Sequence, residues 1–263
     1  MKSWMKYVLL GVASYLIFVI VQFPANKAYY LVEDTLDDKN VPIEVFGLKG
    51  SLWQGSASTL IYDGKRYDAV VWEFHPLELL TAKASVSVRF KGKNTTVKGK
   101  FAKSIFGSLI AENVQANIGA TELLSLLKIP AVKLGGDFAL NLSRFELTDK
   151  TVNYIQGRLL WSDAESKFPQ KLTMGDVFSD FSTSEDGVIL AKLGDGGGPL
   201  ELNGDLSVNP DGKYDLKGLL AARAGRQSVL GRSLGFIGKY DAKGKASFNK
   251  SGNISEFGFL VNK

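Results

Sequence analysis

The sequence predicts a mainly β protein, in which a single N-terminal transmembrane helix precedes an extended, twisted antiparallel β structure of two related halves with short helices. The first observation is composition, because 28 glycines and 7 prolines among 263 residues suit many short strands joined by turns. The second is the repeated alternation of apolar and polar residues over short segments. The third is one uncharged segment near the N-terminus.

That uncharged segment is Tyr7–Val21, which approaches the ~20 apolar residues that a membrane-spanning helix needs. Lys2 and Lys6 precede it, and the positive-inside rule therefore predicts a cytoplasmic N-terminus and an extracytoplasmic body. Pro24 ends or kinks the helix, and a second helical segment is predicted over Ala25–Leu36.

The domain boundary follows from this segment. Residues 1–36 are predicted to form the cytoplasmic N-terminus, a transmembrane signal anchor and a juxtamembrane segment, and residues 37–263 to form the β-rich body. A cleaved signal peptide is the alternative, because the apolar run is short. We favour an uncleaved anchor, since the residues from Phe23 to Ala28 lack a small-x-small cleavage site.

The stretch from Gly47 to Leu80 predicts a β-hairpin followed by a corner. Asp63-Gly64 is a two-residue turn signal, because glycine accepts the positive φ of a primed turn. Pro76 cannot donate a hydrogen bond to a sheet, so it ends the return strand and opens a short helix over Pro76–Leu80. Trp53 and Trp72 stand at similar distances from the turn, and we predict that a bulge near Gly55 brings them level as buried core partners.

The rest of the chain alternates between strand and turn patterns. Lysines near its second hairpin, between Lys91 and Lys103, are interpreted as edge and turn residues that discourage strand association. Strands are predicted at 84–90, 95–101, 136–142, 152–161, 188–192, 200–208, 214–220, 245–249 and 256–261, with helices at 121–128, where Thr121 is the cap, and at 227–237.

The order of these patterns indicates an internal duplication, with halves at about 43–130 and 131–263. In each half a turn-linked pair of strands ends on a tryptophan, Trp72 or Trp161. In each half a proline follows the tryptophan, with a leucine three residues beyond it, from Pro76 to Leu79 and from Pro169 to Leu172. Chance agreement among glycine-rich strands is the alternative.

Little in the chain points to chemistry, and we predict no enzyme, no cofactor, and no catalytic, cofactor-binding or metal site residue. Cysteine is absent, and the single histidine, His75, is interpreted as a corner residue at a strand end. Without Lys2 and Lys6 the chain has 30 basic and 27 acidic residues, a balance that predicts no nucleic-acid partner. The glycine run from Asp195 to Gly198 lacks the Gly-Lys-Ser/Thr ending of a phosphate loop and is interpreted as a flexible turn.

Two patterns carry a family resemblance. Gly50-Ser-Leu-Trp53-Gln-Gly55-Ser-Ala57 and Trp72-x-x-x-Pro76-x-x-Leu79-Leu80 together resemble the opening signature of the type II secretion system protein N family. A later Gly157-x-Leu-x-Trp161 and the Gly204 to Gly212 segment agree. The resemblance implies a non-catalytic accessory component of the bacterial inner membrane, with a single span and a periplasmic body. Its implied partners are other inner-membrane components of the machinery that exports folded proteins across the outer membrane.

A rival hypothesis comes from another class of envelope protein. Membrane-anchored proteins of the AsmA type also combine a short leader with glycine-punctuated strands, and a long sheet with an apolar lining could bind or transfer lipid. The lipid-bound state of the purified body would discriminate the two hypotheses.

Overall fold

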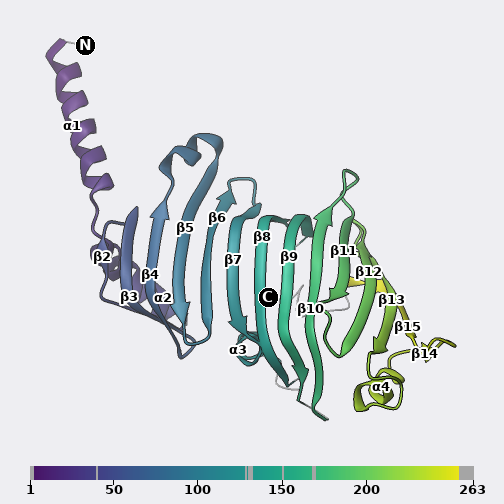
Figure 1. The fold of residues 1–263 in the computed structure, drawn as a ribbon. Helices are drawn as coiled ribbons and strands as arrows, with labels where there is room; N and C mark the ends of the chain where they lie inside the picture. The colour runs from purple at the N-terminus through teal and green to yellow at the C-terminus, as the bar shows by residue number, and fades with distance from the viewer. Residues whose placement is uncertain are drawn as a thin grey trace. The chain divides into compact units, whose positions relative to one another are not determined.

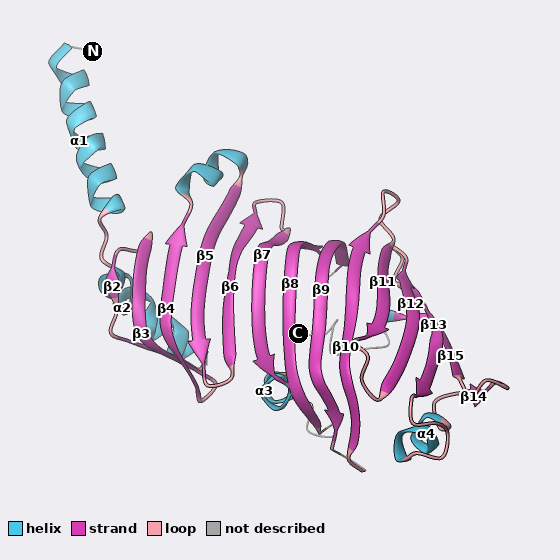
Figure 2. Cartoon of the chain, viewed as in Figure 1, coloured by secondary structure: helices cyan, strands magenta, loops and turns pink. Residues whose placement is uncertain are grey.

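A computed structural model describes residues 3–39, 41–127, 129, 133–149, 151–167 and 170–254. The chain divides into two compact units, Met1–Lys93 and Asn94–Lys263, which are described separately below. Figure 1 labels their helices and strands, and Figure 2 separates helix from strand by colour. In both units antiparallel strands dominate, which confirms the prediction of a mainly β antiparallel protein.

Unit 1 combines helices with a small antiparallel sheet. Its strands run in the order β1-β3-β4-β5, and β2 pairs with β3. The elements are α1 Ser3–Val21, α2 Ala25–Asp38, β1 Ile43–Phe46, β2 Lys49–Gly50, β3 Gln54–Tyr62, β4 Lys65–Phe74, the 3₁₀ helix η1 Pro76–Thr81 and β5 Lys83–Gly92.

The hairpin prediction is confirmed in detail. Tyr62 pairs with Lys65, so Asp63 and Gly64 form the two-residue turn, and both have positive φ, at 48° and 71°. These values are those of the primed turn that matches the twist of the strands. At the far end of β4, Pro76 opens η1 as predicted.

The N-terminal segment is helical, as α1 covers the whole of Tyr7–Val21, while Lys2 lies outside the described residues. None of the helices within the described residues has the length and apolar character needed to cross a membrane. The second predicted helix is present as α2, which begins directly after Pro24.

Unit 2 is one antiparallel sheet with two short helices. Neighbouring strands follow the order β6-β7-β8-β9-β10-β11-β12-β13-β15-β14. The elements are β6 Thr95–Ser104, β7 Leu109–Gly119, α3 Ala120–Leu126, β8 Leu134–Thr148, β9 Thr151–Ser166, β10 Leu172–Thr183, β11 Ile189–Asp195, β12 Leu200–Val208, β13 Lys213–Ala222, α4 Val229–Leu234, β14 Lys239–Tyr240 and β15 Ala246–Asn253.

Two long strands of unit 2, β7 and β10, are missed by the sequence analysis, and bulges explain why. Asn113 in β7 has φ +52°, and the register between β6 and β7 shifts beside it. Gly175 in β10 has φ +82° at two consecutive register shifts against β9. A bulge inserts one residue and so interrupts the alternation by which a strand is recognised.

The helices of unit 2 differ from their predictions at the ends. Gly119, not Thr121, is the N-cap of α3, and α4 is shorter than the predicted 227–237 because its glycines and flanking turns limit it. Leu172 begins a strand and does not follow the helical pattern of Leu79. Lys128, Pro130, Pro169 and the strand predicted at 256–261 lie outside the described residues.

The core of unit 2 is concentrated where α4 meets the sheet. Leu230 and Leu234 of α4 are buried against Leu200 of β12 and Ala246 of β15. Among the lysines interpreted as edge residues, Lys100 of β6 instead forms an ion pair with Glu112 of β7, with 3.3 Å between Nζ and Oε2. The internal duplication stays a prediction.

Candidate functional site

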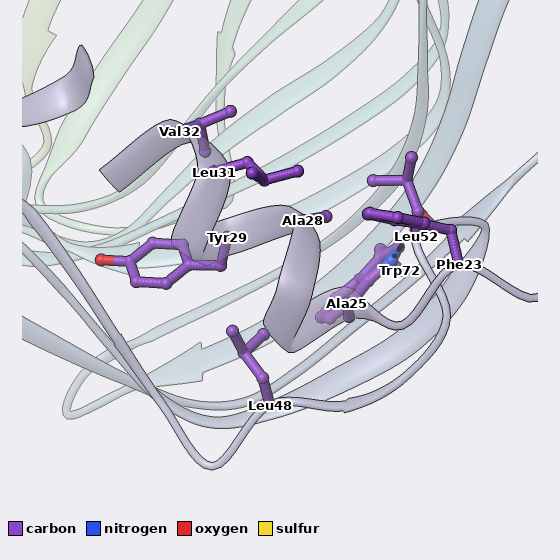
Figure 3. A pocket seen from close by; sticks show the side chains of 9 residues that line it. All are labelled: Phe23, Ala25, Ala28, Tyr29, Leu31, Val32, Leu48, Leu52 and Trp72. Carbon is purple, nitrogen blue, oxygen red and sulfur yellow. Dashed lines mark hydrogen bonds between the residues drawn. The ribbon is translucent and has the colours of Figure 1, made fainter. Parts of the chain in front are cut away.

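Unit 1 contains an apolar groove under helix α2, which we call the α2 groove. Its volume is about 420 Å³, within the ~300–1,000 Å³ typical of ligand pockets. Figure 3 shows its nine lining side chains: Phe23, Ala25, Ala28, Tyr29, Leu31, Val32, Leu48, Leu52 and Trp72. None of them carries a charge, so the groove suits an apolar occupant.

The sequence of α2 explains one wall of the groove. Ala25, Ala28, Tyr29 and Val32 recur at helical spacing and so share one face of the helix. Ala25 is buried, but Val32 remains 47% exposed and Leu31 68% exposed. The apolar face of α2 is therefore only partly covered within this chain.

Backbone contacts fix the start of α2 to the sheet. The Leu52 N–H donates to the Phe23 carbonyl at 2.9 Å, and Pro24 forms an antiparallel bridge with Ser51. The Pro24 carbonyl in turn accepts hydrogen bonds from the N–H groups of Lys27 and Ala28. These contacts hold the mouth of the groove beside the tight β2–β3 turn.

The floor of the α2 groove is Trp72 on β4. It pairs directly with Gly55 on β3, and its indole ring occupies the space that a side chain at Gly55 would fill. The indole Nε1–H donates to the Leu52 carbonyl at 3.1 Å. The half-buried ring is thus held in place while one surface lines the groove.

The predicted pairing of Trp53 with Trp72 is wrong. The register between β3 and β4 is regular past Gly55, so Trp72 lies opposite that glycine. Trp53 lies opposite the next residue on the same face, Phe74, with ring centroids 5.0 Å apart. Both tryptophans are half-buried, and the bulge lies in β4 against β5, where Ala69 has φ +51°.

A second candidate surface is one face of the sheet of unit 2, which we call the apolar face. Residues directly opposite one another in a sheet point to the same side, as do residues two apart in a strand. Three adjacent rows on this face are mostly apolar. The rows are Ile118, Phe138, Trp161 and Val177; Val97, Ala116, Leu140, Leu159, Ser179, Leu193, Gly204, Gly218 and Phe248; and Val114, Leu142, Gly157, Phe181, Ala191, Leu206, Leu216 and Lys250.

Helices pack near one end of this sheet. α3 packs against β7 and β8, and α4 packs against β10 and β13. Both helices belong to the end at which β7 and β13 finish, and Figure 2 shows this arrangement. Away from them, side chains such as Leu140, Leu159 and Phe181 remain half-buried. The apolar face is therefore covered at one end and partly open to solvent elsewhere.

The opposite face of this sheet has a polar central row that carries alternating charge, and we call it the polar face. The central row is Lys98, Gln115, Asn141, Arg158, Asp180, Lys192, Asp205, Lys217 and Asn249. From Arg158 onward, opposite charges face each other on successive strands, and Arg158 and Asp180 form an ion pair at 2.7 Å. Opposite cross-strand charges favour this register over alternatives that would separate them.

His75, the single histidine of the chain, is interpreted from sequence as a corner residue. His75 Nε2 lies 2.7 Å from Ser87 Oγ, which links the end of β4 to β5. Within the described ranges no carboxylate contacts the His75 ring to complete a nucleophilic triad, and no group of three or more potential metal ligands is found. The hydrogen bond between His75 and Ser87 is therefore interpreted as a link between β4 and β5.

The glycine run after β11 is ordered by Asp195 and Arg223. Burial of the Asp195 carboxylate raises its pKa, but hydrogen bonds from the Leu202 N–H, Arg223 and the Gly197 N–H outweigh burial and hold the pKa below its usual value. Arg223 also donates to the carbonyls of Gly198 and Leu200. The run is a turn, as interpreted from sequence, but these hydrogen bonds brace it, which the interpretation of a flexible turn did not include.

A family model and two curated relatives all match this chain, and all three carry the same family description. A family model described as "Type II secretion system (T2SS), protein N" matches residues 42–249. The chain is 25% identical over 260 residues to a type II secretion system protein N of Vibrio cholerae, with 97% of this chain and 100% of the relative covered. It is 24% identical over 263 residues to a type II secretion system protein N of Aeromonas hydrophila, with the same coverage. No solved structure matches.

Proposed function

Because the chain belongs to the type II secretion system protein N family, it takes part in type II secretion, and we propose that it does so as a non-catalytic accessory component of the inner membrane. In this proposal α1 is a single uncleaved anchor and the β-rich body lies in the periplasm. A helix that is apolar on all sides needs lipid or protein around it, and Leu9, Leu10 and Phe18 of α1 are each more than half exposed.

The observation that carries the proposed contact role is the α2 groove. Its lining is apolar throughout, its wall α2 is only partly covered, and its floor is braced by the Trp72 hydrogen bond. A braced apolar groove can receive the apolar side chains of a partner helix or strand. We propose that this partner is another inner-membrane component of the secretion machinery.

Filling the groove should block this contact. We expect Ala28→Trp to lower the export of folded substrates about tenfold, the change that ~1.4 kcal/mol of lost binding produces, while the protein remains at its normal level. Export is measured in a strain that carries the variant in place of the native gene. Lys27→Trp is the matched control, because Lys27 is exposed on the same helix and does not line the groove. The proposal would be contradicted if both the Ala28→Trp strain and a strain that lacks the gene exported the substrates normally.

The second candidate function, lipid binding, is favoured by the apolar face of unit 2. Three rows of mostly apolar side chains lie side by side on it, and many are half-buried without a described helix above them. Acyl chains could cover such a face, because burying apolar surface is favourable roughly in proportion to its area.

This candidate predicts phospholipid bound to the purified full-length chain. Leu140 and Asn141 are adjacent in β8 but point to the apolar and polar faces, so they form a matched pair of test positions. We expect Leu140→Glu to remove most of the lipid that mass spectrometry detects in organic extracts, and Asn141→Glu to retain it. Equal lipid in both variants, once both are shown to be folded, would count against lipid on this face.

A further inference from the structure

The corner helix η1 exposes three leucines to solvent. Leu77 is 78% exposed, Leu79 is 51% exposed and Leu80 is 85% exposed, and we call this group the leucine corner. Isolated exposed leucines are common on protein surfaces, but three within a helix of six residues form a local apolar patch.

Two polar side chains of this corner, Glu78 and His75, contact β5 instead of facing solvent. Glu78 accepts a hydrogen bond from the hydroxyl of Ser85, which is fully buried on β5. His75, just before η1, contacts Ser87 on the same strand. The charged residue of the helix therefore faces the protein and its leucines face outward, the reverse of the arrangement that water favours.

The leucine corner lies close to the end of α1. The carbonyl of Phe23, just beyond α1, accepts from the Leu52 N–H, and the next residue, Trp53, accepts a hydrogen bond from the Phe74 N–H at 2.6 Å. η1 begins two residues after Phe74. These two contacts therefore link the residue two beyond the end of α1 to the residue two before η1 across two strand spacings of ~4.8 Å each. Figure 2 shows both at the same end of the unit 1 strands.

Resting on the anchor role proposed above for α1, we propose that the leucine corner inserts into the surface of the lipid bilayer around that helix. Leu52, whose backbone N–H bonds to Phe23 just beyond α1, adds a further exposed apolar side chain in this part of unit 1. Lys83, separated from η1 by one residue, begins β5, where an ammonium group can reach anionic headgroups while the leucines enter the acyl region. This second contact would fix the orientation of the unit 1 sheet at the membrane, which one helix cannot do.

Single-cysteine probes test the proposal cleanly, because the native chain has no cysteine. The full-length chain is reconstituted into vesicles of phosphatidylethanolamine and phosphatidylglycerol with the environment-sensitive dye NBD at one position. We expect NBD on Leu80→Cys and on Leu77→Cys to shift its emission to shorter wavelength and to be quenched by lipids with spin-labelled acyl chains. The control, NBD on Asp63→Cys at the opposite end of β4, should keep the emission it has in water.

A third probe, on Leu9→Cys in α1, separates this proposal from the anchor itself. If the α1 probe is quenched and the Leu80 and Leu77 probes are not, the leucine corner does not contact lipid, while the proposed insertion of α1 into the bilayer is supported. If no probe is quenched, both the anchor role of α1 and the lipid contact of the leucine corner are contradicted. If the corner probes respond only after other secretion components are added, the corner binds protein and the proposal is overturned. None of these outcomes decides whether the α2 groove is needed for export.

Discussion

Replacing Gly218 with valine is expected to destabilise the part of unit 2 formed by β12, β13 and β15. Gly218 of β13 pairs with Gly204 of β12 and with Phe248 of β15. A β-carbon at Gly218 would lie 2.5 Å from the Asn203 carbonyl oxygen, 2.6 Å from the Phe248 ring and 2.7 Å from the Gly204 α-carbon. Two of these three atoms are backbone, so a change of side-chain rotamer cannot relieve the overlap.

The expected cost of Gly218→Val is ~3 kcal/mol, at the upper end of the usual range for overpacked sites. For a unit of this size such a loss lowers the melting temperature by about 6–12 °C. Because the chain has two units, a single melting curve is ambiguous, and hydrogen exchange measured peptide by peptide is the better readout. Exchange should accelerate in β12, β13 and β15 and stay unchanged in unit 1.

Lys217→Val is the matched control for Gly218→Val. It adds a β-branched residue at the adjacent position of the same strand, but Lys217 is exposed on the polar face. We expect no acceleration of exchange within β12 or β15 for this variant. If both variants behave alike, the close packing of Phe248 over the two glycines does not govern stability here.

The second large effect is expected for Trp72→Ala. Trp72 is half-buried, so the expected loss is about 2–3 kcal/mol, below the ~3–5 kcal/mol of a fully buried aromatic side chain. The change removes the ring above Gly55 and the hydrogen bond to the Leu52 carbonyl, and it opens the floor of the α2 groove. Against a typical domain stability of ~5–15 kcal/mol, this loss should lower the protein level in the envelope.

The hydrogen-exchange protection of unit 1 and the abundance of the protein should fall together in Trp72→Ala. Trp72→Phe is the control, since it keeps a ring over Gly55 but loses the Nε1–H donor, and we expect it to recover most of the stability. A Trp72→Ala protein that is as stable as wild type but no longer supports export would assign Trp72 to partner binding and not to folding.

Several elements were predictable because their signals are local. The turn at Asp63-Gly64, the start of η1 at Pro76 and the strand at 200–208 each depend on residues within one short segment. The β7 and β10 strands were not predictable by the same means, because Asn113 and Gly175 interrupt their alternation at bulges. A bulge is stable only when a neighbouring strand accepts the shifted register.

The candidate sites were less predictable than the strands. The amphipathic pattern of α2 is visible in the sequence, but nothing in it shows that Trp72 would form the floor of a groove beneath that helix. The pairing of Trp53 with Phe74 was missed, because the prediction assumed a bulge near Gly55, whereas the β3–β4 register is regular and the bulge lies in β4 against β5. The inward direction of Glu78 in η1 likewise depends on Ser85 of the next strand.

The sequence alone therefore determined the antiparallel β class, the helical N-terminal segment and the family, since composition, alternation and short motifs carry that information. Only the tertiary structure decided which residues face each other across strands and which apolar side chains remain uncovered. The apolar face of unit 2 and the leucine corner are both of this kind, because exposure depends on the neighbours that surround a side chain and not on its own identity.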